Sequence, residues 1–365
     1  MKKIVAACIF VACVYLLKVS VSENSMKEIT ESRYQSTGMF SSSKYKYGDL
    51  FGLTYLKDFM LKEDRFPNKP LNIKKNPENL SLHIISDSYV FGPFADKKEY
   101  FSRARNLKFY PWKDKNWELP KLDSNLINIA IVEVIERERA YVLNLDNIKS
   151  RLSINNENGK VVVSQQQQQH FFLLKAINTT QQFFKFIGSI FYHKNIDTHL
   201  EFVLFDFEFL LPFKLWKADL NYHVFNRINS DVVLSKDGKN LYVKSTIDKN
   251  SPGSSFREID NKEIENQVFQ MNEISRYLKL MGFQKVLFTL IPNPVSVLKT
   301  ELQPMNEFVN RVQNNPKLQV EFLDLNKELS KNPDFYFCRS DTHWNSNGID
   351  LWIYNVNNYL NSIPQ

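Results

Sequence analysis

The chain has 365 residues, of which 43% are hydrophobic and 14% aromatic, enough to bury the core of one large domain or of two smaller ones. Lys and Arg outnumber Asp and Glu by 47 to 40, which gives a net charge of +7 at pH 7. This excess is modest and spread along the chain, without an ordered basic and aromatic recognition element, so we expect no nucleic-acid partner. An anionic glycan or a membrane surface is compatible with it.

The first residues have the pattern of an export signal. Two lysines precede an apolar run over residues 4–17, which is short for a membrane span but suits the core of a secretory signal. Small residues follow before Glu23, so residues 1–22 are predicted to be a signal peptide or, if uncut, a signal anchor. The residues around Cys13 loosely resemble a lipoprotein box, but the apolar run continues after the cysteine, which disfavours lipidation. We therefore expect a periplasmic or otherwise extracytoplasmic location.

Neither the cysteines nor the histidines predict a metal site. Two of the three cysteines lie in the apolar run at the start, which leaves Cys338 as the only one in the rest of the sequence. One cysteine allows no internal disulfide there and no cysteine-based metal centre. His193, Asp197 and His199 lack a further strong ligand and the helical spacing of a histidine pair, so we assign them surface or core roles.

Residues 23–79 are predicted to be an N-terminal extension. They are polar and lysine-rich and show no sustained periodicity, apart from a possible short helix within residues 51–61.

A buried strand is predicted next, over residues 82–85, and it ends in Ser86-Asp87-Ser88. Ligands collect at the carboxyl ends of such strands in α/β folds. Residues 91–107 are expected to form the following helix, whose first amide groups could help to hold an oxyanion. An ordinary turn with a capping serine is the alternative interpretation.

Two further strands are predicted, over residues 108–112 and 126–135. The second is almost continuously apolar and ends at Glu136 and Arg137. Charges at the end of a buried parallel strand would lie on the same rim as Ser88, so both residues are candidates for the site. A local salt bridge at a solvated helix start is an equal alternative.

Residues 141–260 are predicted to be an insertion that covers or extends the site. The stretch contains a glutamine run, an aromatic-rich segment, and two alternating runs on either side of Asp237-Gly238. Such an Asp-Gly pair between alternating runs predicts a β-hairpin.

The C-terminal part alternates helix and strand, which favours a parallel sheet. The predicted elements are helices over residues 261–281, 301–314 and 349–360 and strands over residues 285–291 and 320–323. Asn293 follows one of these strands in a rim loop and is a site candidate, although a simple turn role is the default.

The motif Asp341-Thr342-His343-Trp344 comes just before the last predicted helix. An Asp and a His two residues apart can present a carboxylate and an imidazole from one loop. Ser88 could meet them to complete a nucleophile, a base and an orienting acid. Alternatively, Asp341 only caps the helix and His343 only packs beside Trp344.

Asp-Ser-Tyr at residues 87–89 and Asp-Thr-His-Trp-Asn at residues 341–345 resemble the SGNH hydrolase superfamily, especially its branch of alginate O-acetyltransferase-like proteins. The resemblance covers residues 80–139 and 260–360. It implies a flavodoxin-like three-layer α/β/α domain with a parallel sheet, here over residues 80–365 with the inserted region.

The resemblance also implies an exported enzyme, often membrane-anchored, that handles acetyl esters of extracellular polysaccharide with a Ser-His-Asp triad. In this sequence the matching residues are Ser88 as nucleophile, His343 as base and Asp341 as its orienter. No cofactor and no metal are expected.

The sequence departs from the family pattern in two ways. The serine motif precedes the Asp-x-His motif, as in ordinary SGNH esterases, whereas the alginate-type acetyltransferases have the reverse order. The glycine and asparagine that other members contribute to the oxyanion hole are not evident. Candidates for oxyanion or substrate contacts are therefore Arg137, Asn293, Glu136, Tyr89 and Trp344.

Three functions follow as hypotheses. The first is an O-acetyltransferase of exopolysaccharide biosynthesis, with a polysaccharide acceptor, an acetyl donor and, as a further option, a membrane-bound acetyl-transfer partner. The motif order favours a carbohydrate acetyl esterase instead. The missing oxyanion signals motivate a third hypothesis, a non-catalytic glycan-binding or assembly protein.

Overall fold

The computed structural model describes residues 2–35, 38–42, 46–68, 78–91, 98–114, 117–154, 196–299 and 304–364. The glutamine run, the aromatic-rich segment and His193 lie outside these residues. The chain divides into two compact units, unit 1 (Met1–Lys46 and Asn156–Val224) and unit 2 (Tyr47–Asn155 and Phe225–Gln365). Unit 2 thus takes in residues 47–79, which we expected in the extension, and both ends of the expected insertion.

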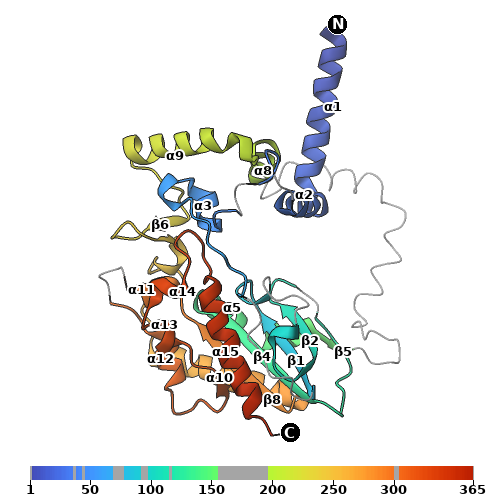
Figure 1. Cartoon of the computed structure of the whole chain (residues 1–365), viewed down its shortest axis with the longest axis vertical. Coiled ribbons are helices and arrows are strands. Elements are labelled where there is room, and N and C mark those ends of the chain that lie inside the picture. Colours follow the sequence, from blue (N-terminus) through green and yellow to red (C-terminus); the bar gives the residue numbers. More distant parts are fainter. Residues whose placement is uncertain are drawn as a thin grey trace. The chain divides into compact units, whose positions relative to one another are not determined.

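Unit 2 is built on a five-stranded sheet in the order β2-β1-β4-β8-β9, in which each strand is parallel to its neighbours (Figure 1). The strands are β1 (Leu80–Ser86), β2 (Ala104–Pro111), β4 (Ile127–Ile135), β8 (Lys285–Ile291) and β9 (Glu321–Phe322). Numbered within the sheet, this is the order 2-1-3-4-5 of flavodoxin-like sheets. The predicted α/β class with a parallel sheet is confirmed.

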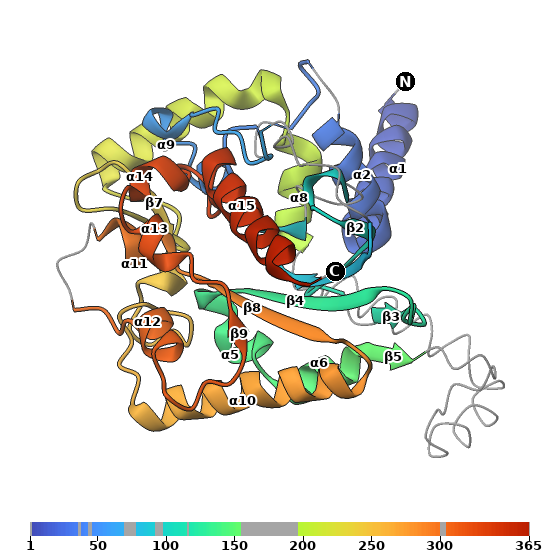
Figure 2. The ribbon, with the colours of Figure 1, turned by 60° about the horizontal axis from the view of Figure 1, so that its bottom comes forward.

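Alternating side chains give the sheet two buried faces. In β4, Ile129 and Ile131 belong to one hydrophobic cluster, whereas Ala130 and Val132 belong to the other. The first cluster includes the apolar face of α15 (Ser346–Ser362), and the second includes that of α10 (Asn261–Leu280). Figure 2 shows the sheet between these two helices, so the unit has three layers.

The other described helices of unit 2 are short. They are α3 (Asp49–Thr54), α5 (Arg139–Val142), α6 (Leu145–Arg151), α11 (Pro294–Leu298), α12 (Phe308–Gln313), α13 (Asn326–Leu329) and α14 (Pro333–Tyr336). Single 3₁₀ turns occur at η1 (Lys57–Phe59), η2 (Lys98–Tyr100), η3 (Glu136–Glu138) and η5 (Lys244–Thr246).

Two small sheets complete the unit. The predicted hairpin is confirmed as the antiparallel pair β6 (Val232–Leu234) and β7 (Leu241–Val243), with Gly238 at a φ of 73° in its turn. The parallel pair β3 (Trp117–Leu119) and β5 (Leu152–Ile154) was not predicted.

Two predicted helices are wrong in part. The helix expected over residues 91–107 cannot include residues 104–107, because β2 already starts at Ala104. This strand lies at the edge of the sheet, where polar residues such as Arg105 and Asn106 are tolerated. The helix expected over residues 301–314 begins only at Phe308, after Glu307 adopts a left-handed φ of 51°.

The described residues of unit 1 form four longer helices and one 3₁₀ turn. They are α1 (Lys2–Val21), α2 (Glu23–Gln35), α8 (Ile196–Phe205), η4 (Glu208–Leu210) and α9 (Leu211–Phe225), whose last residue is assigned to unit 2. α1 is long and apolar enough to cross a membrane, and its place near the N-terminus also suits a signal sequence. The Nδ1 atom of His199, on α8, lies 2.6 Å from the carbonyl oxygen of Ser20, so this histidine connects α8 to α1.

Candidate active site

Ser88 and His343 meet although 255 positions separate them in the sequence. β1 ends at Ser86, and the turn that follows presents Ser88 as an exposed residue. Ser88 Oγ lies 2.8 Å from His343 Nε2, which is hydrogen-bonding distance. The serine hydroxyl can therefore pass its proton directly to this imidazole.

Asp341 holds the opposite side of the imidazole. Its Oδ1 lies 2.5 Å from His343 Nδ1 and also accepts the backbone amide of His343 at 3.0 Å. An ionised carboxylate can only accept, so Nδ1 carries the proton and the lone pair of Nε2 faces Ser88. Burial would raise the pKa of Asp341, but the hydrogen bond and charge of His343, together with Arg65, lower it to about 2.

The cap of the last helix is Asn345, whose side chain accepts from the amides of Asn347 and Gly348. Asp341 lies before the helix and does not cap it, so that alternative reading of the motif is wrong.

The segment that precedes β1 supplies contacts that the sequence analysis missed. The carboxylate of Asp49 accepts the backbone amide and the hydroxyl of Thr342, at 2.8 and 2.5 Å. The backbone amide of Asp49 donates to Asp341 Oδ2 at 2.9 Å. Arg65 Nη1 lies 3.1 Å from the same carboxylate oxygen and 3.3 Å from His343 Nδ1. Residues 47–68 therefore form part of the site.

The start of the loop that carries Asp341 and His343 is also held by hydrogen bonds to the segment before β1. Glu63 accepts the backbone amides of Arg339 and Ser340 and the hydroxyl of Ser340, at 2.9 to 3.0 Å. Gly48 has a φ of 108°, and a Cβ placed on it would lie 2.3 Å from the carbonyl oxygen of Ser340. Only glycine fits such a close approach. The sequence signals for these contacts are weak, since a lone Gly-Asp pair and scattered charges are common in polar segments.

Two acidic side chains, the half-buried Asp87 and the buried Glu133, lie next to the Ser88 turn. Asp87 accepts the amide of Tyr89 at 2.8 Å and that of Ile135 at 3.3 Å, while its own amide donates to Glu133 at 3.0 Å. Burial and the neighbouring charge of Asp87 raise the pKa of Glu133 well above its ordinary value. The hydrogen bonds of Asp87 and Glu133 thus connect the turn after β1 to β4 beside the nucleophile.

Tyr89 and Trp344 join the two halves of the site. Both are almost fully buried. The Tyr89 hydroxyl donates to the carbonyl of Thr342, and Trp344 Nε1 donates to the carbonyl of Tyr89 at 3.1 Å. We predicted both as oxyanion or substrate contacts, but their polar atoms are directed at the protein backbone.

Glu136 and Asn293 also lie in the interior. The Glu136 carboxylate accepts a hydrogen bond from the backbone N–H of Asn293 at 2.8 Å. The side-chain nitrogen Nδ2 of Asn293 donates to the carbonyl of Gly253 and the hydroxyl of Ser255, at 3.1 and 2.9 Å. Burial raises the pKa of Glu136. These predicted contacts of the site therefore connect β4 and β8 to the loop around Ser255.

Arg137 is the predicted contact that keeps a partly exposed side chain at this rim. Its side chain is 16% exposed, and its guanidinium lies 5.5 Å from the centre of the Tyr89 ring. Burial disfavours the cation, but Tyr89 and Asp87 raise the pKa of Arg137 above its ordinary value. A permanent positive charge is thus held close to the Ser88 turn.

Asp49, Asp341 and His343 place three potential ligand atoms within 4.8 Å of one another, as in some metal sites. The Arg65 guanidinium lies against the same Asp341 carboxylate, and a second cation beside it would be repelled. The hydrogen bonds described above account for the arrangement of these groups.

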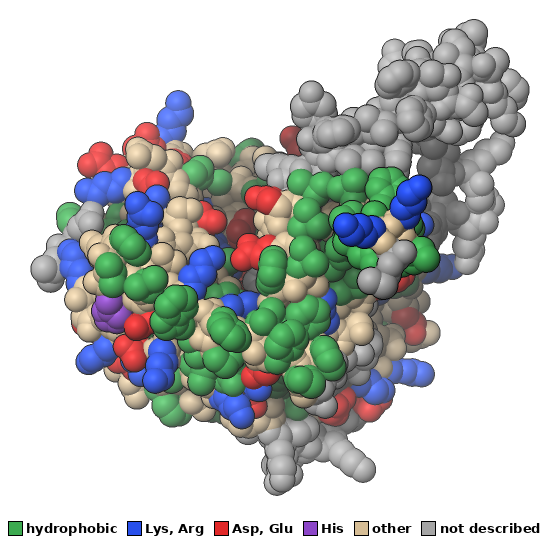
Figure 3. Space-filling model, turned by 90° about the horizontal axis from the view of Figure 1, so that it is seen from above, with side chains coloured by type: hydrophobic (Ala, Val, Ile, Leu, Met, Phe, Trp, Pro, Cys, Tyr) green, Lys and Arg blue, Asp and Glu red, His purple; other side chains and the backbone are tan. Residues whose placement is uncertain are grey.

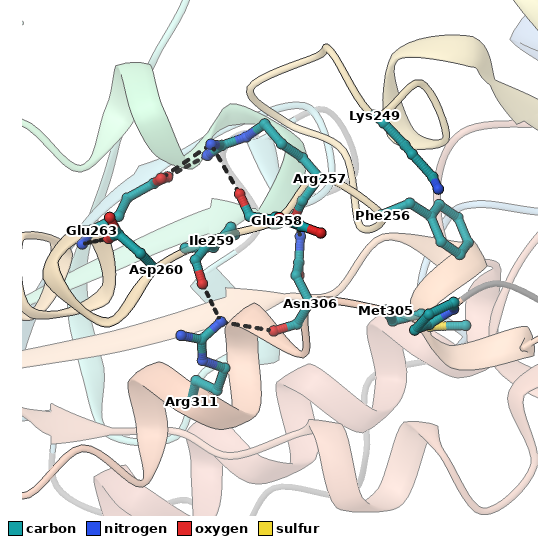
Figure 4. Close-up of a pocket in the computed structure, with 11 residues that line it drawn as sticks. Lys249, Phe256, Arg257, Glu258, Ile259, Asp260, Glu263, Met305, Asn306 and Arg311 are labelled. Atoms are coloured by element: carbon teal, nitrogen blue, oxygen red, sulfur yellow. Dashed lines mark hydrogen bonds and ion pairs between the residues drawn. The ribbon is translucent and has the colours of Figure 1, made fainter.

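A separate hollow of about 890 Å³ occurs elsewhere in unit 2 (Figure 4). None of the residues that line it belongs to the Ser88, His343 and Asp341 group. Its arginines are occupied, because Arg257 pairs with Glu263 and Arg311 donates to the carbonyls of Ile259 and Asn306. The geometry therefore favours the rim around Ser88 as the functional site.

No family model, curated protein or solved structure matches the chain. The functional proposal rests on the residues and their arrangement.

Proposed function

We propose that this chain is an SGNH-type serine acyltransferase that O-acetylates an extracellular or cell-envelope polysaccharide through an acetyl-serine intermediate. The observation that supports it most is the connected series Ser88, His343 and Asp341, with distances of 2.8 and 2.5 Å between neighbouring polar atoms. Nucleophile, base and orienting carboxylate in this order are the arrangement of a Ser-His-Asp triad.

In the first half of the reaction, His343 Nε2 takes the hydroxyl proton while Ser88 Oγ attacks the acetyl carbonyl carbon. The carbonyl electrons move to oxygen, which gives a tetrahedral oxyanion. Its collapse breaks the bond to the donor alcohol, and His343 returns the proton to that alcohol. In the second half, His343 deprotonates the acceptor hydroxyl, which attacks the acetyl-serine carbonyl. Collapse of the second tetrahedral oxyanion breaks the bond to Ser88 Oγ, and His343 returns the proton to that oxygen.

The oxyanion needs donors close to Ser88. The Ser88 backbone amide follows the carboxyl end of β1, and Arg137 brings a positive charge to the same turn. Removing one donor of this kind typically costs about 10² to 10³ in rate. We assign these two groups to the oxyanion, in place of the glycine and asparagine of other SGNH proteins.

An acetyl esterase of the same fold is the second candidate. Its specific support is the exposure of Ser88, because water that reaches the acetyl-serine would hydrolyse it. The transferase and the esterase share every step except the identity of the final acceptor.

We place the reaction outside the cytoplasm. The support is α1, whose apolar stretch suits a signal sequence or a membrane anchor, together with the polysaccharide substrate proposed above.

The test measures acetate release from a chromogenic acetyl ester and acetyl transfer to polysaccharide-derived oligosaccharides. We expect Ser88→Ala and His343→Ala to abolish both activities, while Ser150→Ala, at an exposed serine of α6, retains them. Hydrolysis without transfer to any oligosaccharide would favour the esterase. If the unmodified protein shows neither activity, or if Ser88→Ala is as active as it, the proposal is wrong and a glycan-binding role gains support.

A further inference from the structure

α9 has a stripe of large apolar side chains on its exposed side. Phe213, Trp216, Leu220 and Val224 are 69, 67, 38 and 65% exposed. Their spacings of three and four residues place them on one face of the helix. We call this face the α9 stripe.

The inward face of α9 is occupied by other residues. Leu211 is buried, and Lys214 Nζ lies 3.2 Å from the carboxylate of Asp206 at the end of α8. The stripe is therefore the second, outward face of a helix already attached to its unit. Large apolar side chains in a row on an outward face mark a surface that contacts another molecule or a membrane.

The apolar surface continues beyond α9. Met39 and Phe40 are 57 and 64% exposed, and the ring of Phe40 lies 6.2 Å from the rings of Phe207 and Phe209. In Figure 3, which looks from above in the view of Figure 1, many hydrophobic side chains are visible among charged and polar ones.

α8 connects this surface to α1. Residues 4–15 of α1 are exposed, whereas Val19 and Ser20 at its end are buried. The contact with α8 occurs there, between His199 and the carbonyl of Ser20. If the apolar stretch of α1 lies in a bilayer, α8 therefore lies at the bilayer surface.

The position of α9 follows from two further links. Arg33 of α2 donates to the carbonyls of Val203 and Asp206 at the end of α8, at 2.7 and 3.3 Å. Asp206 in turn binds Lys214 of α9. Within unit 1, Figure 1 shows α9 running across the direction of α1. A helix that runs across a membrane-spanning helix, and is linked to the end of it through α8, is oriented along the membrane surface.

We propose that α9 lies in the headgroup region of the bilayer that α1 crosses, with the α9 stripe at the boundary of the acyl chains. Tryptophan is enriched at this depth because its ring is apolar and its N–H is polar. Lys217, which is also exposed, can reach the phosphates. This inference is independent of the acyl-transfer chemistry, because all the residues that support it belong to unit 1.

The test uses the fluorescence of Trp216 in the full chain. The sequence has 5 tryptophans. The other four, Trp112, Trp117, Trp344 and Trp352, are at most 6% exposed. We would insert the protein into phosphatidylcholine nanodiscs whose lipids have bromine on the acyl chain near the headgroup. We expect bromine to quench part of the emission, and this part to be absent in Trp216→Phe.

A second variant checks that quenching depends on the stripe. Phe213→Glu combined with Leu220→Glu should restore Trp216 emission and make it accessible to acrylamide. Phe269→Glu, at an exposed phenylalanine of α10, should change neither measurement. Equal quenching in the unmodified protein and Trp216→Phe would overturn the proposal, as would failure of the chain to stay with the nanodisc. Protection of Trp216 only in nanodiscs with two copies would assign the stripe to a second copy instead of lipid.

Discussion

Asp341 is surrounded by hydrogen-bond donors from two separate segments of the chain. Its oxygens accept from His343 on one side and from Arg65 and the amide of Asp49 on the other. Charged and amide donors of this kind favour the ionised form, which is why the pKa falls to about 2 in spite of burial. The carboxylate is thus fixed in charge and in position before any substrate binds.

We predict that Asp341→Asn removes catalysis by changing the imidazole tautomer. An amide at this position can donate to Nδ1, which turns the proton of the ring toward Ser88. For serine triads such a change costs about 10⁴-fold in kcat. The measurement is kcat for acetyl ester hydrolysis, and a loss of less than about 10-fold in kcat would contradict a triad role for Asp341.

The same variant should change the acid stability. A carboxyl whose pKa is lowered by folding stabilises the native state above its unfolded pKa, about 3.9, and this contribution is lost as the pH falls toward about 2. The free energy of unfolding of the unmodified protein should therefore fall with decreasing pH in this window more steeply than that of Asp341→Asn. Parallel curves from urea titrations would show that Asp341 is not held as described.

At the scale of elements, the site is assembled where two loops meet at the carboxyl ends of β1 and β4. The loop before the last helix is packed against the segment before α3, and Gly48 is the point of closest approach. Its backbone conformation and its missing side chain are both required there.

We predict that Gly48→Ala lowers the free energy of unfolding by about 2 kcal/mol or more and reduces kcat, since strain of about 1 to 3 kcal/mol is typical of an unfavourable φ and the new methyl would displace Ser340. Gly238→Ala is the matched control, because Gly238 also has a positive φ but no atom within 4 Å of an added Cβ. Calorimetry and ester hydrolysis on both variants check this. Equal effects would mean that the contact with Ser340 is unimportant.

For Asp87 and Glu133, next to the Ser88 turn, the unfolding free energy is predicted to depend on pH in the direction opposite to that for Asp341. Since burial raises the pKa of Glu133, the folded protein keeps a proton that the unfolded chain releases above its ordinary pKa of about 4.3. The unfolding free energy of the unmodified protein should therefore decrease as the pH rises above that value. Glu133→Gln keeps an acceptor for the amide of Asp87 and does not titrate.

We accordingly expect Glu133→Gln to gain stability relative to the unmodified protein as the pH increases, while kcat at neutral pH stays within a few-fold. Glu138→Gln, on the exposed side of the same rim, is the control. The measurement is the unfolding free energy across a pH series. A difference between Glu133→Gln and the unmodified protein that does not vary with pH would contradict a raised pKa of Glu133.

Periodicity accounts for the elements that the sequence predicts well. β8 and α10 have the predicted limits to within one residue, because β8 is a short, mostly apolar run and the apolar positions of α10 repeat at the spacing of a helix. The topology explains the place of Ser88, which follows the carboxyl end of β1. His343 lies on the loop between α14 and α15, and its part in the site was predicted from the Asp-x-His motif. The contacts of Asp49 and Arg65 follow no such rule. They depend on a glycine conformation and on backbone groups, which leave no periodic pattern in residues 47–68.

At the scale of the whole molecule, the chemistry and the apolar surface belong to different units. Among the described residues, three hydrophobic clusters are built from unit 2 alone. Unit 2 therefore has its own core around the site, although its sequence is interrupted by residues 156–224.

We predict that unit 2 unfolds as a cooperative transition of its own. Trp112, Trp117, Trp344 and Trp352 all lie in unit 2, so the emission of Trp216→Phe reports on this unit alone. Replacing Arg33 by Met removes its hydrogen bonds to α8 within unit 1 and should leave the midpoint of that emission change unmoved. By contrast, Trp352→Phe, on the buried face of α15, should lower the midpoint, because it leaves a cavity among packed side chains. If Arg33→Met shifts the midpoint as far as the core variant does, the two units unfold together, and the stability of the site depends on the helices of unit 1.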